Sequence, residues 1–260
     1  MPVLFIGHGS PTNALETNVA TETWRYLAET LPRPKAVLCI SAHWYTRGTA
    51  VTAMAKPRTI HDFGPLAPEL FTIQYPAPGD PALATRVQSL LAPTLVTLDS
   101  SWGLDHGTWS VMVKAYPNAD MPVVQLSMDM TLSPAQHLAL AQRLKPLRDE
   151  GILIIGSGNI VHNLSIMNWD KASPPYDWAL RFNQRIKDAI LRDDPQSVCD
   201  YTAAGRDAEL AVPSPDHYWP LLYSLGARDA GDKVTFLTDF IQFRSLGMTS
   251  AYFGAQPLAV

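Results

Sequence analysis

Short apolar runs alternate along the chain with longer segments in which apolar residues recur at helical spacing. The apolar runs end at glycine, proline or polar clusters, which is typical of strands buried inside a sheet. The runs that we interpret as strands cover residues 3–6, 36–41, 49–54, 94–98, 122–128, 151–156 and 250–253.

The segments of helical periodicity cover residues 18–31, 81–91, 133–148 and 176–192. Ser133 is a good N-cap and Pro134 suits the first helical position. This alternation predicts an α/β fold with a central, mostly parallel or mixed sheet and helices on both faces. Because no flexible linker or repeat interrupts the pattern, we expect residues 1–260 to form a single domain.

The overall composition limits the function classes. A content of 47% hydrophobic and 17% charged residues indicates a globular protein, and the net charge of −4 argues against nucleic-acid or anionic-membrane partners. No apolar window is long enough to span a bilayer, and the opening residues are too few for a signal peptide. Two cysteines, Cys39 and Cys199, are too few for a disulfide framework. We therefore expect a cytoplasmic protein.

Four of the seven histidines stand in short motifs that follow strand-like runs or lie in proline-stiffened loops. Ligands of α/β proteins bind beyond the carboxyl ends of the strands, so imidazoles delivered there from separate segments can meet at one ion. The sequence therefore predicts a mononuclear, imidazole-rich metal centre. Its candidate ligands are His8, His43, His162 and His217.

The other three histidines lie in less informative contexts. His106 follows Asp105 in a glycine-bounded turn, and His61 lies in an aperiodic segment, 58–79, that we interpret as a wall of the pocket. His137 occupies a polar position of the predicted 133–148 helix, where we expect it to be exposed to solvent.

The ligand set leaves the metal open. Three neutral imidazoles suit Zn²⁺, and an open fourth position would make such a site catalytic. Two histidines with a carboxylate suit non-haem Fe(II), and Asp105, Asp129 and Asp216 are the candidate carboxylates.

The ordered series of motifs is similar to that of the DOPA 4,5-dioxygenase group of class III extradiol ring-cleavage dioxygenases. The resemblance extends over nearly the whole chain, and its motifs are jointly specific although none is so alone. They are Gly7-His8-Gly9-Ser10-Pro11, Ser41-Ala42-His43-Trp44, Tyr75-Pro76-Ala77-Pro78-Gly79, Gly103-Leu104-Asp105-His106-Gly107-Thr108-Trp109, Gln125-Leu126-Ser127 and Gly156-Ser157-Gly158-Asn159 with His162.

The resemblance implies a role for each candidate. His8 and His43 are metal ligands, and His217 stands where the wider superfamily places a glutamate ligand. His162 corresponds to the active-site base, close enough to the metal to serve as a ligand in a resting or zinc-filled state. His106 corresponds to a second pocket histidine that contacts substrate oxygens.

The implied reaction uses a small-molecule catechol and O2, and the ring opens beside the two oxygens. Exchanging glutamate for His217 makes the ligand set neutral and favours Zn²⁺, which has no redox chemistry. We therefore expect one divalent ion per chain, Zn²⁺ as isolated or Fe²⁺ as required for dioxygenation. A zinc-dependent hydrolase and a non-catalytic metal-binding member of the family are the alternatives.

The sequence does not define the substrate beyond this class. Trp44, Phe63, Tyr218 and Trp219 are the aromatic residues that could stack on a ring. No arginine or lysine is placed where it could be named as an anchor for the carboxylate of an amino-acid catechol.

Overall fold

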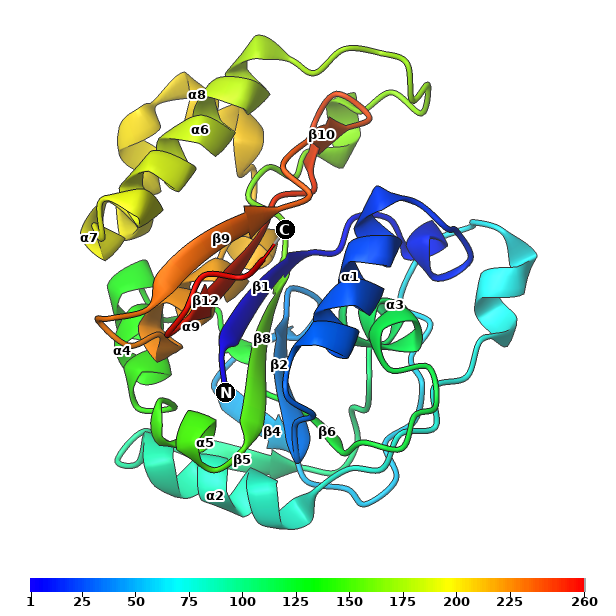
Figure 1. The fold of residues 1–260 in the computed structure, drawn as a ribbon, viewed down its shortest axis with the longest axis vertical. Coiled ribbons are helices and arrows are strands. Elements are labelled where there is room, and N and C mark those ends of the chain that lie inside the picture. Colours follow the sequence, from blue (N-terminus) through cyan, green and yellow to red (C-terminus); the bar gives the residue numbers. More distant parts are fainter. Residues whose placement is uncertain (260) are drawn as a thin grey trace.

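Six strands form the central sheet of the computed structural model, which describes residues 1–259 (Figure 1). Four neighbouring strands are parallel: β6 (Val123–Gln125), β2 (Ala36–Ser41), β8 (Ile152–Gly158) and β1 (Val3–Gly7). Two antiparallel strands, β12 (Ser250–Gly254) and β9 (Lys233–Leu237), extend the sheet beyond β1. The predicted mixed sheet is confirmed.

Alternate residues of the parallel strands enter two separate hydrophobic cores, as the two-residue period of a strand requires. Val3 and Phe5 of β1 belong to one core, whereas Leu4 and Ile6 belong to the other. Because the side chains on both faces of the parallel strands are buried and mostly apolar, helices cover both faces.

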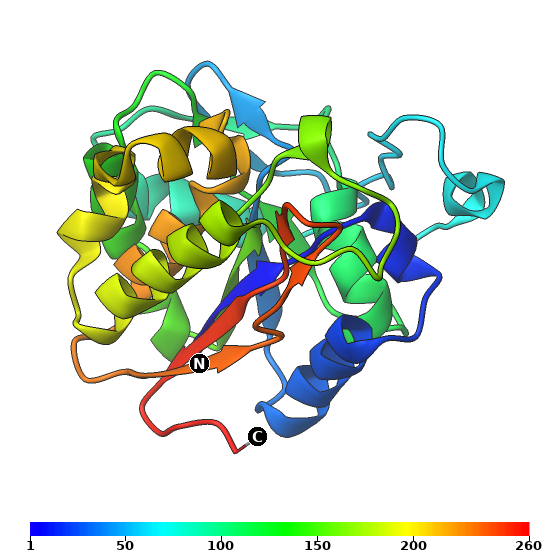
Figure 2. The ribbon, with the colours of Figure 1, turned by 90° about the horizontal axis from the view of Figure 1, so that it is seen from above.

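The helices lie on both faces of the sheet (Figures 1 and 2). One face is covered by α1 (Val19–Thr30) and α3 (His106–Ala115). On the other face, α9 (Pro220–Ala227) contacts β1, β2 and β8. The same core also contains side chains of α2 (Pro81–Leu91), α4 (Pro134–Gln142), α5 (Pro146–Asp149) and α6 (Asp177–Leu191). Within residues 1–259, no helix combines the length and the apolar character needed to cross a membrane.

Short elements complete the fold. Three small strand pairs lie outside the main sheet: β4 (Thr49–Thr52) with β5 (Val96–Asp99), β3 (Tyr45–Thr46) with β7 (Met128–Asp129), and β10 (Ile241–Gln242) with β11 (Leu246–Gly247). Helices α7 (Pro195–Cys199) and α8 (Arg206–Ala211) follow α6. Single 3-10 turns are η1 (Pro11–Ala14), η2 (Pro68–Thr72), η3 (Leu164–Ile166), η4 (Tyr201–Ala204) and η5 (Pro215–His217).

The predicted helix over residues 133–148 is divided in two. Ser133 caps α4 through a hydrogen bond from the Gln136 backbone, as expected, but the helix ends at Gln142. Pro146 has no backbone N–H to donate, so it starts the new helix α5 instead of continuing the old one.

Candidate active site

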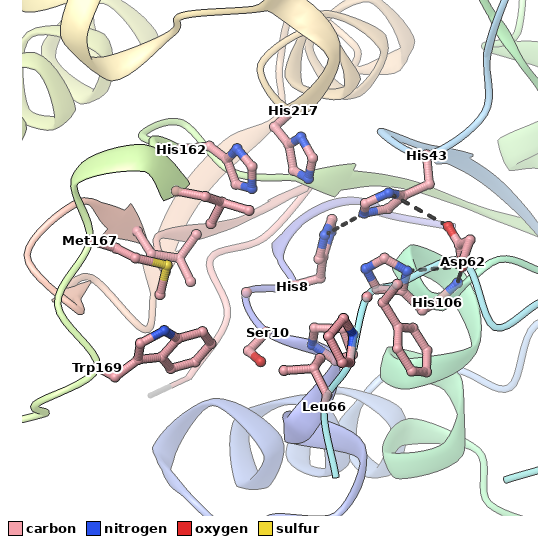
Figure 3. Close-up of a pocket in the computed structure, with 17 residues that line it drawn as sticks. His8, Ser10, His43, Asp62, Leu66, His106, His162, Met167, Trp169 and His217 are labelled. Carbon is pink, nitrogen blue, oxygen red and sulfur yellow. Dashed lines mark hydrogen bonds and ion pairs between the residues drawn. The ribbon is translucent and has the colours of Figure 1, made fainter. Parts of the chain in front are cut away.

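A cavity of about 370 Å³ opens where the parallel strands end, and five of the seven histidines line it (Figure 3). His8 directly follows β1, and His43 follows β2 by two residues. His162 comes four residues after β8, and His217 ends η5. Because β2, β8 and β1 are adjacent, their carboxyl ends bring these imidazoles together. The predicted convergence of His8, His43, His162 and His217 is therefore observed.

The loop that carries His217 is held tightly against the end of β8. The Asn159 backbone N–H donates to the His217 carbonyl oxygen over 2.8 Å. A Cβ at Gly158 would lie 2.1 Å from that same oxygen, so only glycine fits at this point of the strand. The glycine-rich end of β8 thus places His217 at the sheet.

Three of the imidazoles form a compact group of metal-ligand type. Nitrogen atoms of His8, His43 and His217 all lie within 4.8 Å of one another. The Nε2 atoms of His8 and His43 are 3.3 Å apart.

A partner behind each of these rings orients its Nε2 atom toward the others. Ser157 donates its hydroxyl proton to the Gly107 carbonyl, so its Oγ accepts from His8 Nδ1 over 3.0 Å. His217 Nδ1 lies 2.5 Å from Asp216 Oδ2. A carboxylate or hydroxyl behind a ligating histidine fixes its tautomer and leaves the other nitrogen free to bind a metal.

The third ring has a carboxylate behind it as well. His43 Nδ1 lies 3.6 Å from Asp62 Oδ2. With protons on Nδ1 of both rings, the 3.3 Å contact between His8 Nε2 and His43 Nε2 joins two acceptors. Two lone pairs at that distance repel each other unless a proton or a metal ion lies between them, and with a His217 nitrogen within 4.8 Å of both rings' nitrogen atoms the donor set fits a divalent metal ion.

The protonation tendencies agree with this arrangement. Burial and the neighbouring imidazoles lower the pKa of His8 and His43 well below the usual range for histidine. Burial and, to a smaller extent, the neighbouring His162 imidazole lower the pKa of His217 to about 4. The rings are therefore neutral near pH 7, which is the form that binds metal.

His162 lies beside this group without belonging to it. Its ring stacks on that of His217, with centroids 3.5 Å apart and planes within 7°. The His162 backbone N–H donates to the Ala211 carbonyl, which fixes the start of the loop. Burial lowers the pKa of His162 to about 4.

His106 lies beside His43, with ring centroids 3.8 Å apart, and is held there by Asp62, a residue that the sequence did not single out (Figure 3). His106 is the first residue of α3, and both its backbone N–H and its Nδ1 lie 2.9 Å from Asp62 Oδ1. Although burial opposes ionisation of Asp62, the hydrogen bonds from His106 keep the pKa of this carboxyl low. His43, Asp62 and His106 form a second group whose potential ligand atoms all lie within 4.8 Å of one another. The only signal for Asp62 in the sequence was its place in the long 58–79 segment.

The carboxylates proposed from the sequence do not line the cavity. Asp105 is buried and accepts hydrogen bonds from Ser41 and Gln125. Asp129 bonds to Thr131, and Asp216 lies behind His217. None of them belongs to the groups of ligand type found within residues 1–259.

Several other residues are placed differently from expectation. Of the four aromatic candidates for ring stacking, Phe63 lines the cavity, whereas Trp44, Tyr218 and Trp219 are buried in the core. His61 packs beside Phe63 and its Nε2 contacts the Ile73 carbonyl, so it supports the wall without facing the cavity.

The expectation that His137 is exposed is wrong. Its side chain is fully buried, with Nδ1 2.7 Å from the Tyr223 hydroxyl. The ring lies against Trp219. Packing of α4 on α9 overrides the polar character of the residue.

Comparisons with known proteins show which family the chain belongs to. Residues 3–254 match the family model described as the catalytic LigB subunit of aromatic ring-opening dioxygenase. The chain is 48% identical over 258 residues to the 4,5-DOPA dioxygenase extradiol of Escherichia coli (strain K12), covering 98% of this chain and 95% of the relative. It is 36% identical to the protein of the same name from Beta vulgaris, covering 90% of this chain and 89% of the relative.

A solved structure has the same fold. The crystal structure of an uncharacterized protein from Escherichia coli K12 matches with a TM-score of 0.85 and 45% sequence identity, covering 98% of this chain and 100% of that one. The chain therefore belongs to the LigB family of aromatic ring-opening dioxygenases, and the predicted extradiol ring-cleavage class is confirmed.

Proposed function

We propose that this chain opens the ring of a DOPA-like catechol with O2 at one divalent metal ion held by His8, His43 and His217. The observation that carries the proposal is that the Nε2 atoms of His8 and His43 lie 3.3 Å apart. Ser157 and Asp62 lie on the Nδ1 side of these two rings. The bound metal would supply a site that holds the catechol oxygens and O2 together and passes electrons between them. Residues 1–260 act in this proposal as one catalytic domain.

His162 is the proposed base. Its neutral imidazole lines the same cavity as the three ligands, while its nitrogen atoms lie outside their group. It is therefore placed to accept a phenolic proton from a catechol whose oxygens lie against the histidine cluster.

His106 is the proposed partner of the substrate oxygens. Because Nδ1 donates to Asp62, the neutral ring presents Nε2 as an acceptor. A proton taken up at Nε2 makes an imidazolium that the Asp62 carboxylate stabilises directly. His106 can thus hold a proton during ring opening and return it to the product.

The reaction balances without an external reductant. One C–C bond beside the diol breaks, and both atoms of O2 enter the ring-opened product. The neutral imidazole set accepts Zn²⁺ or Fe²⁺, and only iron supports the oxidation because zinc has no redox chemistry. Both cysteines are free and buried, in keeping with a reducing, cytoplasmic setting.

The test is anaerobic reconstitution of metal-stripped protein with Fe(II) or Zn(II), followed by a catechol and air. Oxygen uptake and formation of a ring-opened product are expected with iron and not with zinc. Failure of the iron-loaded protein to consume oxygen with L-DOPA or simple catechols, despite one metal bound per chain, would contradict the proposal and favour a hydrolase.

A further inference from the structure

One loop forms much of the cavity wall next to His162. We name residues 163–176, which lie between His162 and α6, the wall loop. This loop contributes Leu164, Met167 and Trp169 to the lining of the cavity. Figure 3 shows Met167 and Trp169 bordering the cavity on the same side as His162. The position of the wall loop therefore determines the shape of the space around a bound ring.

The turn that joins β10 to β11 holds the middle and the end of the wall loop through backbone hydrogen bonds. The Asn168 N–H donates to the Phe243 carbonyl over 3.1 Å. The Tyr176 N–H donates to the Arg244 carbonyl over the same distance. Two consecutive residues of the turn thus supply acceptors for a loop that has little regular secondary structure of its own.

The side chains of the same two turn residues also pack on the wall loop. The ring of Phe243 is buried and contacts Trp169, with centroids 5.0 Å apart. Arg244 donates from Nε to the Pro174 carbonyl over 3.0 Å, and its guanidinium carbon lies 4.0 Å from the centroid of the Tyr176 ring. A planar guanidinium can stack and donate at once, whereas a lysine ammonium has no flat face to stack.

Phe243 and Arg244 hold these contacts from strained backbone conformations. Their φ angles are +51° and +70°, in the left-handed region that glycine and asparagine adopt most easily. Glycine or asparagine would form such a hairpin turn at lower cost. The turn carries two large side chains instead, and both contact the wall loop. Strain that is kept where side chains border a cavity indicates a functional role for them.

We propose that Phe243 and Arg244 are positioning residues for ring opening, which hold the wall loop in place against the substrate ring. This inference rests on the proposed ring-opening function. A fixed wall confines the ring while the two oxygens of the catechol face the histidines. The two turn residues therefore lower KM by acting through Met167 and Trp169.

Other contacts fix His162, the proposed base. The Gly247 N–H donates to the Val161 carbonyl over 2.8 Å. The Ser245 hydroxyl donates to the Asn163 carbonyl over 2.7 Å. Because these contacts do not involve the side chains of the two positioning residues, a change in those side chains should leave the base in position. The expected result is a rise in KM with little change in kcat.

Arg244→Gly separates positioning from folding, because glycine relieves the left-handed backbone and removes the side-chain contacts with the wall loop. In the iron-loaded protein we expect KM for L-DOPA to rise at least about fivefold and kcat to change by less than about twofold. The midpoint of chemical denaturation should not fall. The matched control is Ala119→Gly, at φ +50°, beyond the end of α3 opposite His106, and it should change neither kinetic constant.

Hydrogen–deuterium exchange measures the position of the wall loop without turnover. In the zinc-loaded protein, peptides covering residues 164–176 should exchange at least about tenfold faster in Arg244→Gly than in the wild type, because this loop opens more often. Peptides from β8 should exchange at the same rate in both proteins, which excludes a general loss of stability. Anaerobic addition of L-DOPA should slow exchange of the wall loop in the wild type.

The contact between Phe243 and Trp169 is tested by a double-mutant cycle. Phe243→Leu and Trp169→Leu should each raise KM for L-DOPA, and the double variant should raise it no further than the stronger single variant. Effects that multiply in the double variant would show that Phe243 does not act through the indole.

The outcomes separate this inference from the proposed function. Unchanged KM and unchanged exchange of the wall loop in Arg244→Gly overturn the positioning role and leave ring opening standing. A loss of kcat at unchanged KM also overturns it, because the turn would then act on His162. If the iron-loaded wild type does not open the ring of L-DOPA, the dioxygenase function fails. In that case the exchange rates alone decide whether the turn holds the wall loop, and equal rates show that it does not.

Discussion

His217 at the cavity and His137 between α4 and α9 are both buried histidines, yet their surroundings give them different chemistry. Burial lowers the pKa of each to about 4. The difference lies in the second nitrogen. His137 contacts Tyr223 through Nδ1, and its Nε2 has no hydrogen-bond partner. His217 is held from behind by Asp216 and shares its other side with His8 and His43. Burial and low basicity therefore do not identify a functional histidine, whereas convergence of oriented nitrogen atoms does.

The largest difference is expected when one histidine is removed from each region. His43→Ala should abolish iron binding and lower turnover by more than about 100-fold. Removing only a residue that supports a metal ligand lowers metal affinity or activity by about 10–100-fold, and removing the ligand itself should lower them further. His137→Phe should keep iron binding and turnover while losing about 1–3 kcal/mol of unfolding free energy, because the Tyr223 hydroxyl loses its partner. Metal analysis, oxygen uptake and chemical denaturation measure these effects. A catalytic defect in His137→Phe as large as in His43→Ala would refute the distinction.

Loss of turnover without loss of metal distinguishes His162 from its stacked neighbour His217. His162→Gln should retain one metal per chain and lower kcat by about 10²–10⁴-fold, the range typical of a lost general base. His217→Gln should lose metal affinity as well. Loss of metal from His162→Gln would instead make His162 a ligand.

Asp62 supports catalysis in a different way, because its carboxylate contacts the imidazoles of both His43 and His106. Asp62→Asn should lower metal affinity or turnover by about 10–100-fold, since it weakens the support of both His43 and His106. Asp120→Asn, on the surface beside Arg33, is the matched control and should change neither. Steady-state kinetics over a titration with Fe(II) separates the loss of affinity from the loss of turnover.

The last prediction is a pH dependence of stability that arises from His137. Its folded pKa of about 4 lies below the ordinary 6.5, so the unfolded chain binds the proton more strongly. The stabilising contribution is complete above pH 6.5 and is lost as the pH falls toward 4, by about 3 kcal/mol at most. Denaturation of metal-free wild type and His137→Phe across this range should show a shallower pH dependence in the variant. Parallel curves would contradict it.

The sequence predicted the approximate positions of the strands and four of the histidines at the cavity because both depend on local patterns. Residues 36–41 and 81–91 match β2 and α2 residue for residue, since an apolar run and a capped amphipathic segment define them. The histidine motifs were informative because parallel strands end at one edge of the sheet.

The remaining features depend on tertiary contacts that no local pattern encodes. Helix α9 was missed because all its residues are buried, which removes the polar face of a helical pattern. Strand β9 was missed because it lies at the edge of the sheet and is only partly buried. Asp62 gained its role through a contact with His106, 44 residues away in the sequence. His137 was misplaced because the packing of α4 on α9 was not predictable.

The most direct test of the metal centre is a titration of metal-free protein with Fe(II) under anaerobic conditions. After each addition, a sample is mixed with a catechol in air-saturated buffer and its oxygen uptake is measured. We expect the rate of oxygen uptake to rise linearly with added iron and to reach a plateau at one iron per chain. His137→Phe should follow the same curve, and His43→Ala should show no uptake at any point. Uptake that needs no iron, saturates at two irons per chain or persists in His43→Ala would contradict a single site at His8, His43 and His217.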